Sequence, residues 1–151
     1  METWELNEKK KEYLNGYKYA KRREKRILEQ IQQLRLDAMF PCLQGDGMPR
    51  GSSQSDLSDY MERYEELMEE LKKERLTALE EMQEILHHIG KLKDEDEKEV
   101  LERRYILMES WDTIAEKMGI DKSTATRKHG KALKNFEIPE SCTSMHIESV
   151  I

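Results

Sequence analysis

Apolar residues recur at spacings of 3 and 4 in two long segments, and this pattern constrains the fold more than any other feature of the sequence. In the first segment the repeat runs through Tyr13, Tyr17, Ala20, Glu24, Ile27, Ile31, Leu34 and Ala38. In the second it runs through Leu57, Tyr60, Tyr64, Leu67, Leu71, Glu74, Ala78, Met82, Ile85 and Ile89. Such spacing is typical of coiled-coil helices. We therefore predict two long helices, each with one apolar seam.

The segment between the two repeats predicts a flexible loop over residues 40–55. It contains two prolines, three glycines and three serines, a density of helix-breaking residues that no helix tolerates. Residues 9–26 hold nine Lys or Arg against two Glu, net +7, whereas residues 56–84 hold four Lys or Arg against eleven acids, net −7. Opposite charges favour pairing of the two helices. We expect a long antiparallel helical hairpin over residues 1–91.

Residues 92–137 show the start and stop signals of three short helices. Asp94 followed by Glu97 is a capping-box pattern, and the helix that it opens should have Val100, Leu101, Arg104, Tyr105 and Met108 on its apolar side. Ser110 should cap a helix from Trp111 to Met118, Gly119 should end it in a left-handed conformation, and Asp121 should cap a last helix from Lys122 to about Phe136. One small core is expected from Ile114, Ala115, Met118, Ile120, Ala125, Ala132, Leu133 and Phe136. The fold class predicted for the chain is all-α: the hairpin, then a three-helix helix-turn-helix domain.

The last of these helices is expected to bind DNA. It contains five Lys or Arg and no acid, whereas residues 94–116 are predominantly acidic. The N-terminal turns of such a helix enter the major groove, which makes Lys122, Ser123, Thr126 and Arg127 the candidates for base contacts. Lys128, Lys131 and Lys134 are candidates for phosphate contacts. His129, inside the same helix, is expected to pack against the preceding helix or touch a phosphate.

The same residues resemble region four of bacterial sigma factors. The resemblance rests on Glu99 to Tyr105 (EVLERRY), Ser110 to Ala115 (SWDTIA), Met118 to Ile120, Ser123 to Arg127 (STATR) and Lys131 to Leu133. It implies a DNA-binding fold in which Thr113 and Lys131 contact phosphates, and RNA polymerase is a further partner that it suggests. The whole chain is similar to small transcriptional regulators of Gram-positive phages. Ala125 departs from the pattern, which prefers valine there, and no promoter-melting region accompanies the domain.

Composition excludes several other classes. The formal net charge is −6, 38% of residues are charged, and no apolar run approaches the length of a membrane span. We expect no signal peptide, a location in the cytoplasm of a bacterial host, and free thiols at Cys42 and Cys142. No catalytic motif, cofactor motif or metal-ligand spacing is evident, and the adjacent His87 and His88 form a poor chelate, so we expect a protein that is not an enzyme.

Three functions fit these features: a transcription regulator that binds double-stranded DNA, a DNA-packaging factor like the phage small terminase subunit, and an adaptor that binds RNA polymerase. The basic run of residues 9–26 fits either a helix face paired within the protein or an auxiliary contact to nucleic acid. A single helix-turn-helix reads few bases, so we expect a homodimer formed through the hairpin. Residues 138–151 are expected to be a disordered tail.

Overall fold

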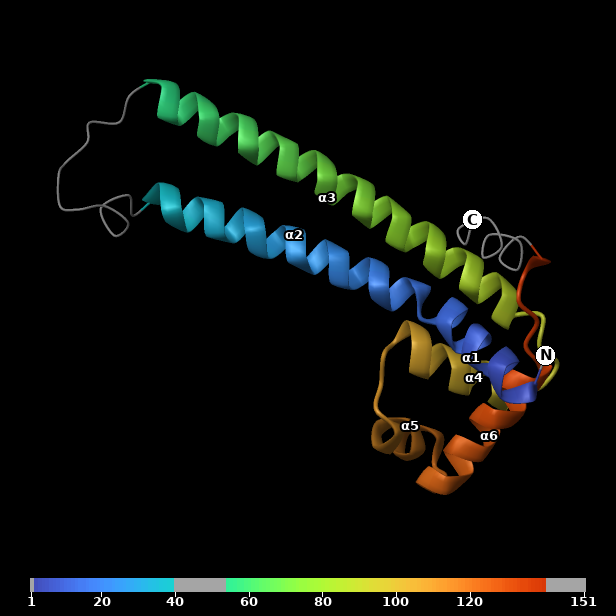
Figure 1. Cartoon of the computed structure of the whole chain (residues 1–151). Helices are drawn as coiled ribbons and strands as arrows, with labels where there is room; N and C mark the ends of the chain where they lie inside the picture. Colours follow the sequence, from blue (N-terminus) through green and yellow to red (C-terminus); the bar gives the residue numbers. More distant parts are fainter. Residues whose placement is uncertain (1, 40–53, 141–151) are drawn as a thin grey trace. The chain divides into compact units, whose positions relative to one another are not determined.

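The computed structural model describes residues 2–39 and 54–140, and within these ranges every regular element is a helix (Figure 1). The all-α expectation is therefore confirmed. The elements are α1 (Thr3–Leu14), α2 (Gly16–Met39), α3 (Gln54–Ile89), α4 (Glu95–Leu101), the π-helical segment η2 (Glu102–Ile106), α5 (Trp111–Met118) and α6 (Lys122–Asn135). The described residues divide into a two-helix unit, residues 20–39 with 54–78, and a terminal unit, residues 2–19 with 79–140.

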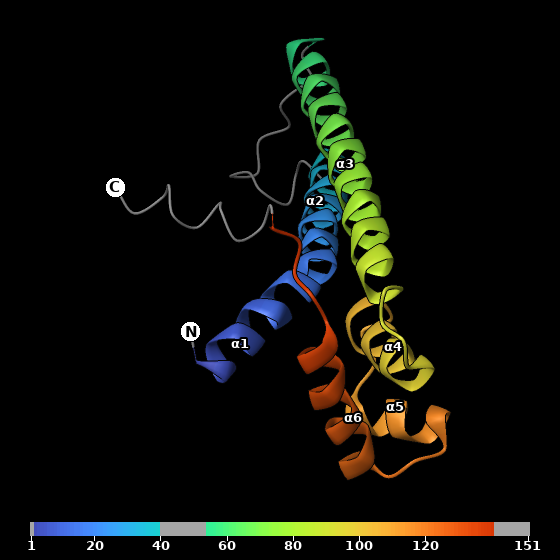
Figure 2. The ribbon, with the colours of Figure 1, turned by 90° about the vertical axis from the view of Figure 1, so that its right-hand side faces the viewer.

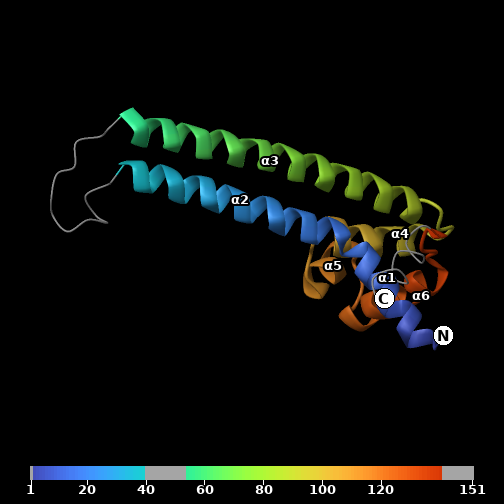
Figure 3. The same cartoon turned by 45° about the horizontal axis from the view of Figure 1, so that its top comes forward.

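In the two-helix unit, α2 and α3 run antiparallel and side by side (Figures 1 and 3). Their core consists of Ile27, Ile31, Leu67 and Leu71, with Leu34, Tyr64 and Met68 packed against it. These residues belong to the predicted seams, apart from Met68. The two ends of the seams differ from expectation, because Ala38 and Leu57 are exposed.

Ion pairs connect the two helices of this unit in both directions. The Arg23 Nε lies 3.0 Å from a Glu74 carboxylate oxygen, and the Arg75 Nε lies 3.2 Å from a Glu24 carboxylate oxygen. Glu24 is buried within the seam and also accepts a hydrogen bond from Lys21 at 2.8 Å. That hydrogen bond is the main cause that lowers the pKa of Glu24. The polar seam position is thus satisfied by basic residues of both helices.

The first predicted helix proves to be two helices. Helix α1 begins at Thr3 and ends at Leu14, Asn15 forms a turn, and α2 starts at Gly16. A Cβ at Gly16 would lie 2.8 Å from a Glu81 carboxylate oxygen, so a side chain at this position would require the flexible end of Glu81 to move. Tyr13 and Tyr17 pack against the core of the terminal unit rather than against the core of the two-helix unit.

The core of the terminal unit joins helices from both ends of the sequence. Its buried members are Leu14, Ile85, Ile89, Leu92, Leu101, Tyr105, Ala132, Leu133 and Phe136. A second cluster contains Ile114, Ala115 and Ala125, with Trp111, Met118 and Ile120 beside them. The single small core predicted for residues 92–137 is therefore two clusters. The terminal unit also differs from the boundary expected at residue 91, because α1 and the end of α3 complete the larger cluster.

The helix that starts at Asp94 departs from the predicted pattern at both ends. Asp94 accepts a hydrogen bond from the Asp96 backbone N–H at 2.9 Å, as a cap should. Glu97 does not complete a capping box, because its buried carboxylate accepts hydrogen bonds of 3.0 and 3.1 Å from the Asn135 amide. After Leu101 the backbone widens into η2, so Met108, predicted on the apolar side of this helix, lies beyond it with a φ of 56° and is exposed.

Helices α5 and α6 begin and end close to the predicted residues. The Ser110 hydroxyl accepts a hydrogen bond from the Thr113 N–H at 3.3 Å, and Gly119 ends α5 in the left-handed region with a φ of 67°. Both predicted caps are confirmed. Asp121 occupies the predicted capping position of α6, but its side chain makes no capping hydrogen bond.

Helix α1 also holds the carboxyl end of α6 (Figure 2). The Lys10 ammonium group is buried and donates a 2.7 Å hydrogen bond to the Leu133 carbonyl and a 3.4 Å hydrogen bond to the Lys134 carbonyl. Carbonyls in the last turn of a helix have no partner within the helix and bear partial negative charge, so a buried cation stabilises them. Burial lowers the pKa of Lys10, and the carboxylate of Glu137 opposes that effect.

Several predicted segments lie outside the described residues. These are residues 40–53 of the expected loop, residues 141–151 of the expected tail, and the two cysteines. Residues 54 and 55, assigned to the loop, begin α3 instead. Among the described helices, none is long and apolar enough to span a membrane.

We predict that Lys10→Met destabilises the protein by about 1.5 to 3 kcal/mol, because it removes charge-assisted hydrogen bonds to two carbonyls that then lack a partner. Urea denaturation followed by circular dichroism measures the change. Lys9→Met is the matched control: Lys9 is the exposed neighbour, and its loss should change stability by less than about 0.5 kcal/mol. Equal stabilities of the two variants would contradict the role assigned to Lys10.

Candidate nucleic-acid interface

Helix α6 has one buried side and one strongly basic side. Ala125, His129, Ala132 and Leu133 are buried, and their spacing places them along one side of the helix. The opposite side is exposed and holds four of the residues predicted to contact DNA: Ser123, Arg127, Lys131 and Lys134. Lys122 and Thr126 are also exposed, but they lie in the first turns of the helix, seven residues before the buried His129 and Leu133. No acidic side chain occurs between Lys122 and Asn135. Four of the predicted contact residues therefore share one surface, and Lys122, Thr126, Lys128 and Thr113 lie outside it.

The cations of α6 differ in their engagement within the protein. Lys128 is half-buried and pairs with Asp96 of α4 at 2.8 Å, an interaction that raises the pKa of Lys128. Lys122 lies 3.3 Å from Asp112 of α5. For the side chains of Arg127, Lys131 and Lys134, no ion pair or hydrogen bond is found with any residue in the described ranges. These three exposed cations are available to an external anion.

The predicted hydroxyl contacts are already used within the chain. The Thr126 hydroxyl donates to the backbone carbonyls of Lys122 and Ser123, at 3.2 and 2.9 Å, so only its acceptor capacity remains. Thr113 lies in the first turn of α5, is half-buried, and shares a 2.9 Å hydrogen bond with the Ser110 hydroxyl. Thr113 therefore supports the helix cap, and a phosphate contact from it would compete with that hydrogen bond.

The rings of Tyr105 and Trp111 pack against the ring of His129 at the middle of α6, on its buried side. The Tyr105 hydroxyl lies 2.7 Å from His129 Nε2, the two rings are stacked with centroids 5.7 Å apart, and the Trp111 ring meets His129 edge-on at 4.9 Å. The Arg104 guanidinium lies over the Trp111 ring, with its central carbon 4.7 Å from the ring centroid. The expectation that His129 packs against the preceding helix is confirmed.

Burial controls the ionisation of this aromatic group. Desolvation, helped by the charges of Lys11 and Arg104, lowers the pKa of His129 to about 4. Burial raises the pKa of Tyr105 to about 12. His129 is therefore a neutral imidazole near pH 7, and it contributes packing and a hydrogen bond to α6 rather than a positive charge to the exposed side.

Several basic residues in the run 9–26 make contacts within the protein. Lys10 binds the end of α6, Lys11 pairs with Glu8 at 2.9 Å, and Lys21 and Arg23 pair with Glu24 and Glu74 respectively. These contacts agree with a helix face paired within the protein. The contact between Lys10 and α6 had no signal in the sequence, because nothing in a run of lysines shows which one is buried.

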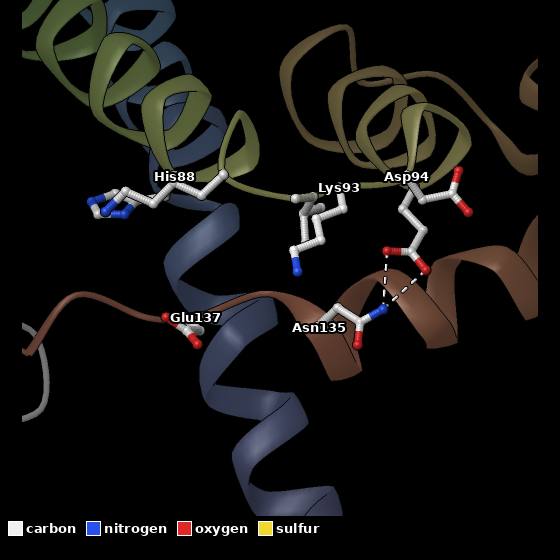
Figure 4. Close-up of a pocket in the computed structure, with 8 residues that line it drawn as sticks. His88, Lys93, Asp94, Asn135 and Glu137 are labelled. Atoms are coloured by element: carbon white, nitrogen blue, oxygen red, sulfur yellow. Dashed lines mark hydrogen bonds between the residues drawn. The ribbon is translucent and has the colours of Figure 1, made fainter.

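A pocket of about 400 Å³ lies beside the carboxyl end of α6 in the terminal unit (Figure 4). It is lined by His88, Lys91, Leu92, Lys93, Asp94, Glu97, Asn135 and Glu137. Two lysines face three carboxylates here, and Glu97 is already bound by Asn135. Desolvation, together with the charge of Lys91, lowers the pKa of His88. The mixed charge of this lining contrasts with the single positive sign on α6, and among the described residues no group of three or more His, Cys, Asp or Glu is placed to hold a metal ion.

Comparison with known families identifies one match. The family model described as "Protein of unknown function (DUF1492)" matches residues 50–137. The chain belongs to this family. The matched range includes all of α3, α4, η2, α5 and α6, whereas α1 and α2 lie outside it. No curated protein matches the chain, and no solved structure matches it either.

We predict that the imidazole of His129 stays neutral down to about pH 5. A histidine in the unfolded chain takes up its proton near pH 6.5, and the folded His129 does so near pH 4. Between these values the unfolded state binds more protons, so His129 lowers the stability of the fold as the pH falls through this window. Titration of the histidine resonances by NMR, with His129 assigned through His129→Gln, measures the pKa directly. Protonation at pH 6.5 or above would contradict the assignment.

Proposed function

We propose that this protein is a sequence-specific DNA-binding transcription regulator of phage type that reads the major groove with α6. The observation that carries the proposal is the exposed side of α6, where Arg127, Lys131 and Lys134 have no partner within the described residues. Three cations on one helix side supply the electrostatic attraction that duplex DNA requires, even in a chain with a net charge of −6, because screening limits distant charges.

The order of the elements around α6 supports the same proposal. Helix α5 precedes α6 by a short turn through Gly119, and the resemblance of this segment to region four of sigma factors implies a helix-turn-helix. In that arrangement the residues near the N-terminus of the second helix reach base edges. Lys122, Ser123 and Arg127 are exposed there, and an arginine binds guanine O6 and N7 in a bidentate manner. We assign base reading mainly to Arg127, because Lys122 pairs with Asp112.

Two other functions are alternatives, and experiments can distinguish each of them from the regulator. A packaging factor like the small terminase subunit would form rings of many copies, and an adaptor would bind RNA polymerase without requiring a particular DNA sequence. Selection of bound duplexes from a random-sequence pool separates the adaptor from the regulator, because only the regulator enriches one sequence. The mass of the particle in solution distinguishes the packaging factor from the regulator, because only the packaging factor would form a ring of many copies. We place the regulator in the cytoplasm of a bacterial host as part of the same proposal.

We predict that Arg127→Ala weakens binding to the selected duplex by about 1 to 3 kcal/mol and relaxes the preference at one base pair. Lys131→Ala and Lys134→Ala should weaken binding to selected and random duplexes equally, and each should lower the salt dependence by about one ion. Fluorescence anisotropy at several salt concentrations measures both effects.

Lys73→Ala, which removes an exposed cation from α3, is the matched control and should leave binding unchanged. An equal loss for Arg127→Ala on selected and random duplexes would contradict base reading by Arg127. Failure of the unmodified chain to enrich any sequence would contradict the proposed function itself.

We further propose that two copies pair through the two-helix unit. An antiparallel helix pair has two open sides, and contacts across the pair define them: Arg75 meets Glu24 and Arg35 meets Tyr64 on one side, and Arg23 meets Glu74 on the other. At about 100° per residue, the first side also holds the apolar residues Leu28, Met39, Leu57, Met61 and Met68. We call it the apolar side.

The contrast with the other side supports pairing of two copies. Around Arg23 and Glu74, the same helical spacing places only polar residues: Arg26, Gln30, Asp37, Asp59, Arg63, Glu70 and Thr77. Leu28, Met39, Leu57 and Met61 are between 41% and 70% exposed, an arrangement that a third and fourth helix would bury. Pairing would double the length of the DNA site, which a single α6 reads over few base pairs.

We predict that the full chain sediments at twice its own mass and that Leu28→Lys raises the dimer dissociation constant at least about tenfold, because each dimer loses two buried leucines. Gln30→Lys, two residues along on the polar side of the same helix, is the matched control and should leave the dimer intact. A monomer both free and on DNA would contradict the pairing, and a particle of many copies would favour the packaging alternative.

A further inference from the structure

Gly130 lies in the interior of α6, and no contact with the described residues explains it. A Cβ added there would meet no atom within 4 Å, so the neighbouring structure leaves room for a side chain. Its backbone is helical, and among the described glycines only Gly119 has a positive φ. At Gly16, by comparison, an added Cβ would meet the Glu81 carboxylate. Gly130 is thus a helical glycine without a conformational or packing reason within the described chain.

Glycine at this position has a cost for folding. In a helix interior, only proline is less favourable, because glycine loses the most backbone entropy when it is ordered. Position 130 is exposed and lies five residues before the end of α6. An alanine would fit and would stabilise the helix. The chain therefore has a destabilising residue at a site where its own packing would accept a better one.

The place of Gly130 on α6 points to the partner. Residues three and four apart are neighbours on a helix surface, so Gly130 lies directly between Arg127, one turn before it, and Lys134, one turn after it. Thr126 and Ser123 continue the line of small residues toward the N-terminus of the helix. Side chains along this line on the basic side of α6 are therefore short or absent. The line is bordered by Arg127, Lys131 and Lys134, the three cations without a partner among the described residues.

We propose that Gly130 is a positioning residue that lets the sugar–phosphate backbone of a DNA duplex approach the axis of α6. This inference rests on the proposed function. Glycine permits the closest approach of a helix backbone to a ligand, since no Cβ projects from it. With the duplex strand seated over Gly130, Arg127 reaches base edges on one side while Lys134 reaches a phosphate on the other. A side chain at 130 would lift the duplex away from both.

Gly130→Ala and Gly130→Leu test the proposal in the full-length chain. Because both residues favour the helix, both variants should melt at a temperature a few degrees above that of the unmodified protein. Binding to the selected duplex should change in the opposite direction. Alanine should weaken it several-fold, and leucine, which projects further, should weaken it more than tenfold. A role in folding alone cannot produce higher stability together with weaker binding that grows with side-chain size.

Ser58→Leu, which introduces the same leucine side chain at an exposed position of α3, is the control and should leave DNA binding unchanged. Circular dichroism and sedimentation establish that each variant is folded and has the mass of the unmodified protein. Binding by both Gly130 variants equal to that of the unmodified chain would overturn this inference and leave the proposed function intact. Failure of the unmodified chain to bind any selected duplex would overturn the proposed function, and this inference with it.

Discussion

The attachment of α6 to the terminal unit is the constraint on which the proposed interface depends. Leu133 and Phe136 are buried in the larger cluster, the ring of His129 rests on Tyr105 and Trp111, and the Lys10 ammonium binds the last carbonyls of the helix. These contacts act at the middle and the carboxyl end of α6, along its buried side only. The opposite side is thereby held rigid and exposed, which is the condition under which a helix presents side chains to a groove in a fixed register.

The cations on the exposed side of α6 differ from several elsewhere in whether an acidic residue neutralises them. Several cations outside α6 are neutralised at short range, as in the pairs Arg23–Glu74 and Arg75–Glu24, whereas the exposed side of α6 retains its charge. Burial keeps His129 neutral, so the positive field of α6 comes from lysine and arginine and does not vary near neutral pH. An acidic protein is thereby compatible with a basic local surface.

The sequence predicted the helices and their caps well where the signal was local. Ser110 and Gly119 bound α5 as expected, because capping hydrogen bonds and a left-handed glycine depend on residues within one turn. The seam through Ile27, Ile31, Leu67 and Leu71 was predicted for the same reason, since a helical period is read from neighbouring residues. The exposed candidates Ser123, Arg127, Lys131 and Lys134 followed from that period together with the charge of α6.

Only the tertiary structure shows which hydrogen-bond partners join segments that are far apart in the sequence. The sequence alone determined the all-α class, the positions of the long helices and the basic sign of α6, since composition and periodicity are properties of contiguous residues. It could not show that Lys10 rather than Lys9 is buried, that Glu97 leaves its capping box for Asn135, or that the backbone widens at η2 and sends Met108 outward. Lys10 and Glu97 find their partners on α6, far along the chain from the residues that surround them in the sequence. A buried polar group needs a hydrogen-bond partner, and a partner that the fold brings from a distant segment cannot be read from neighbouring residues.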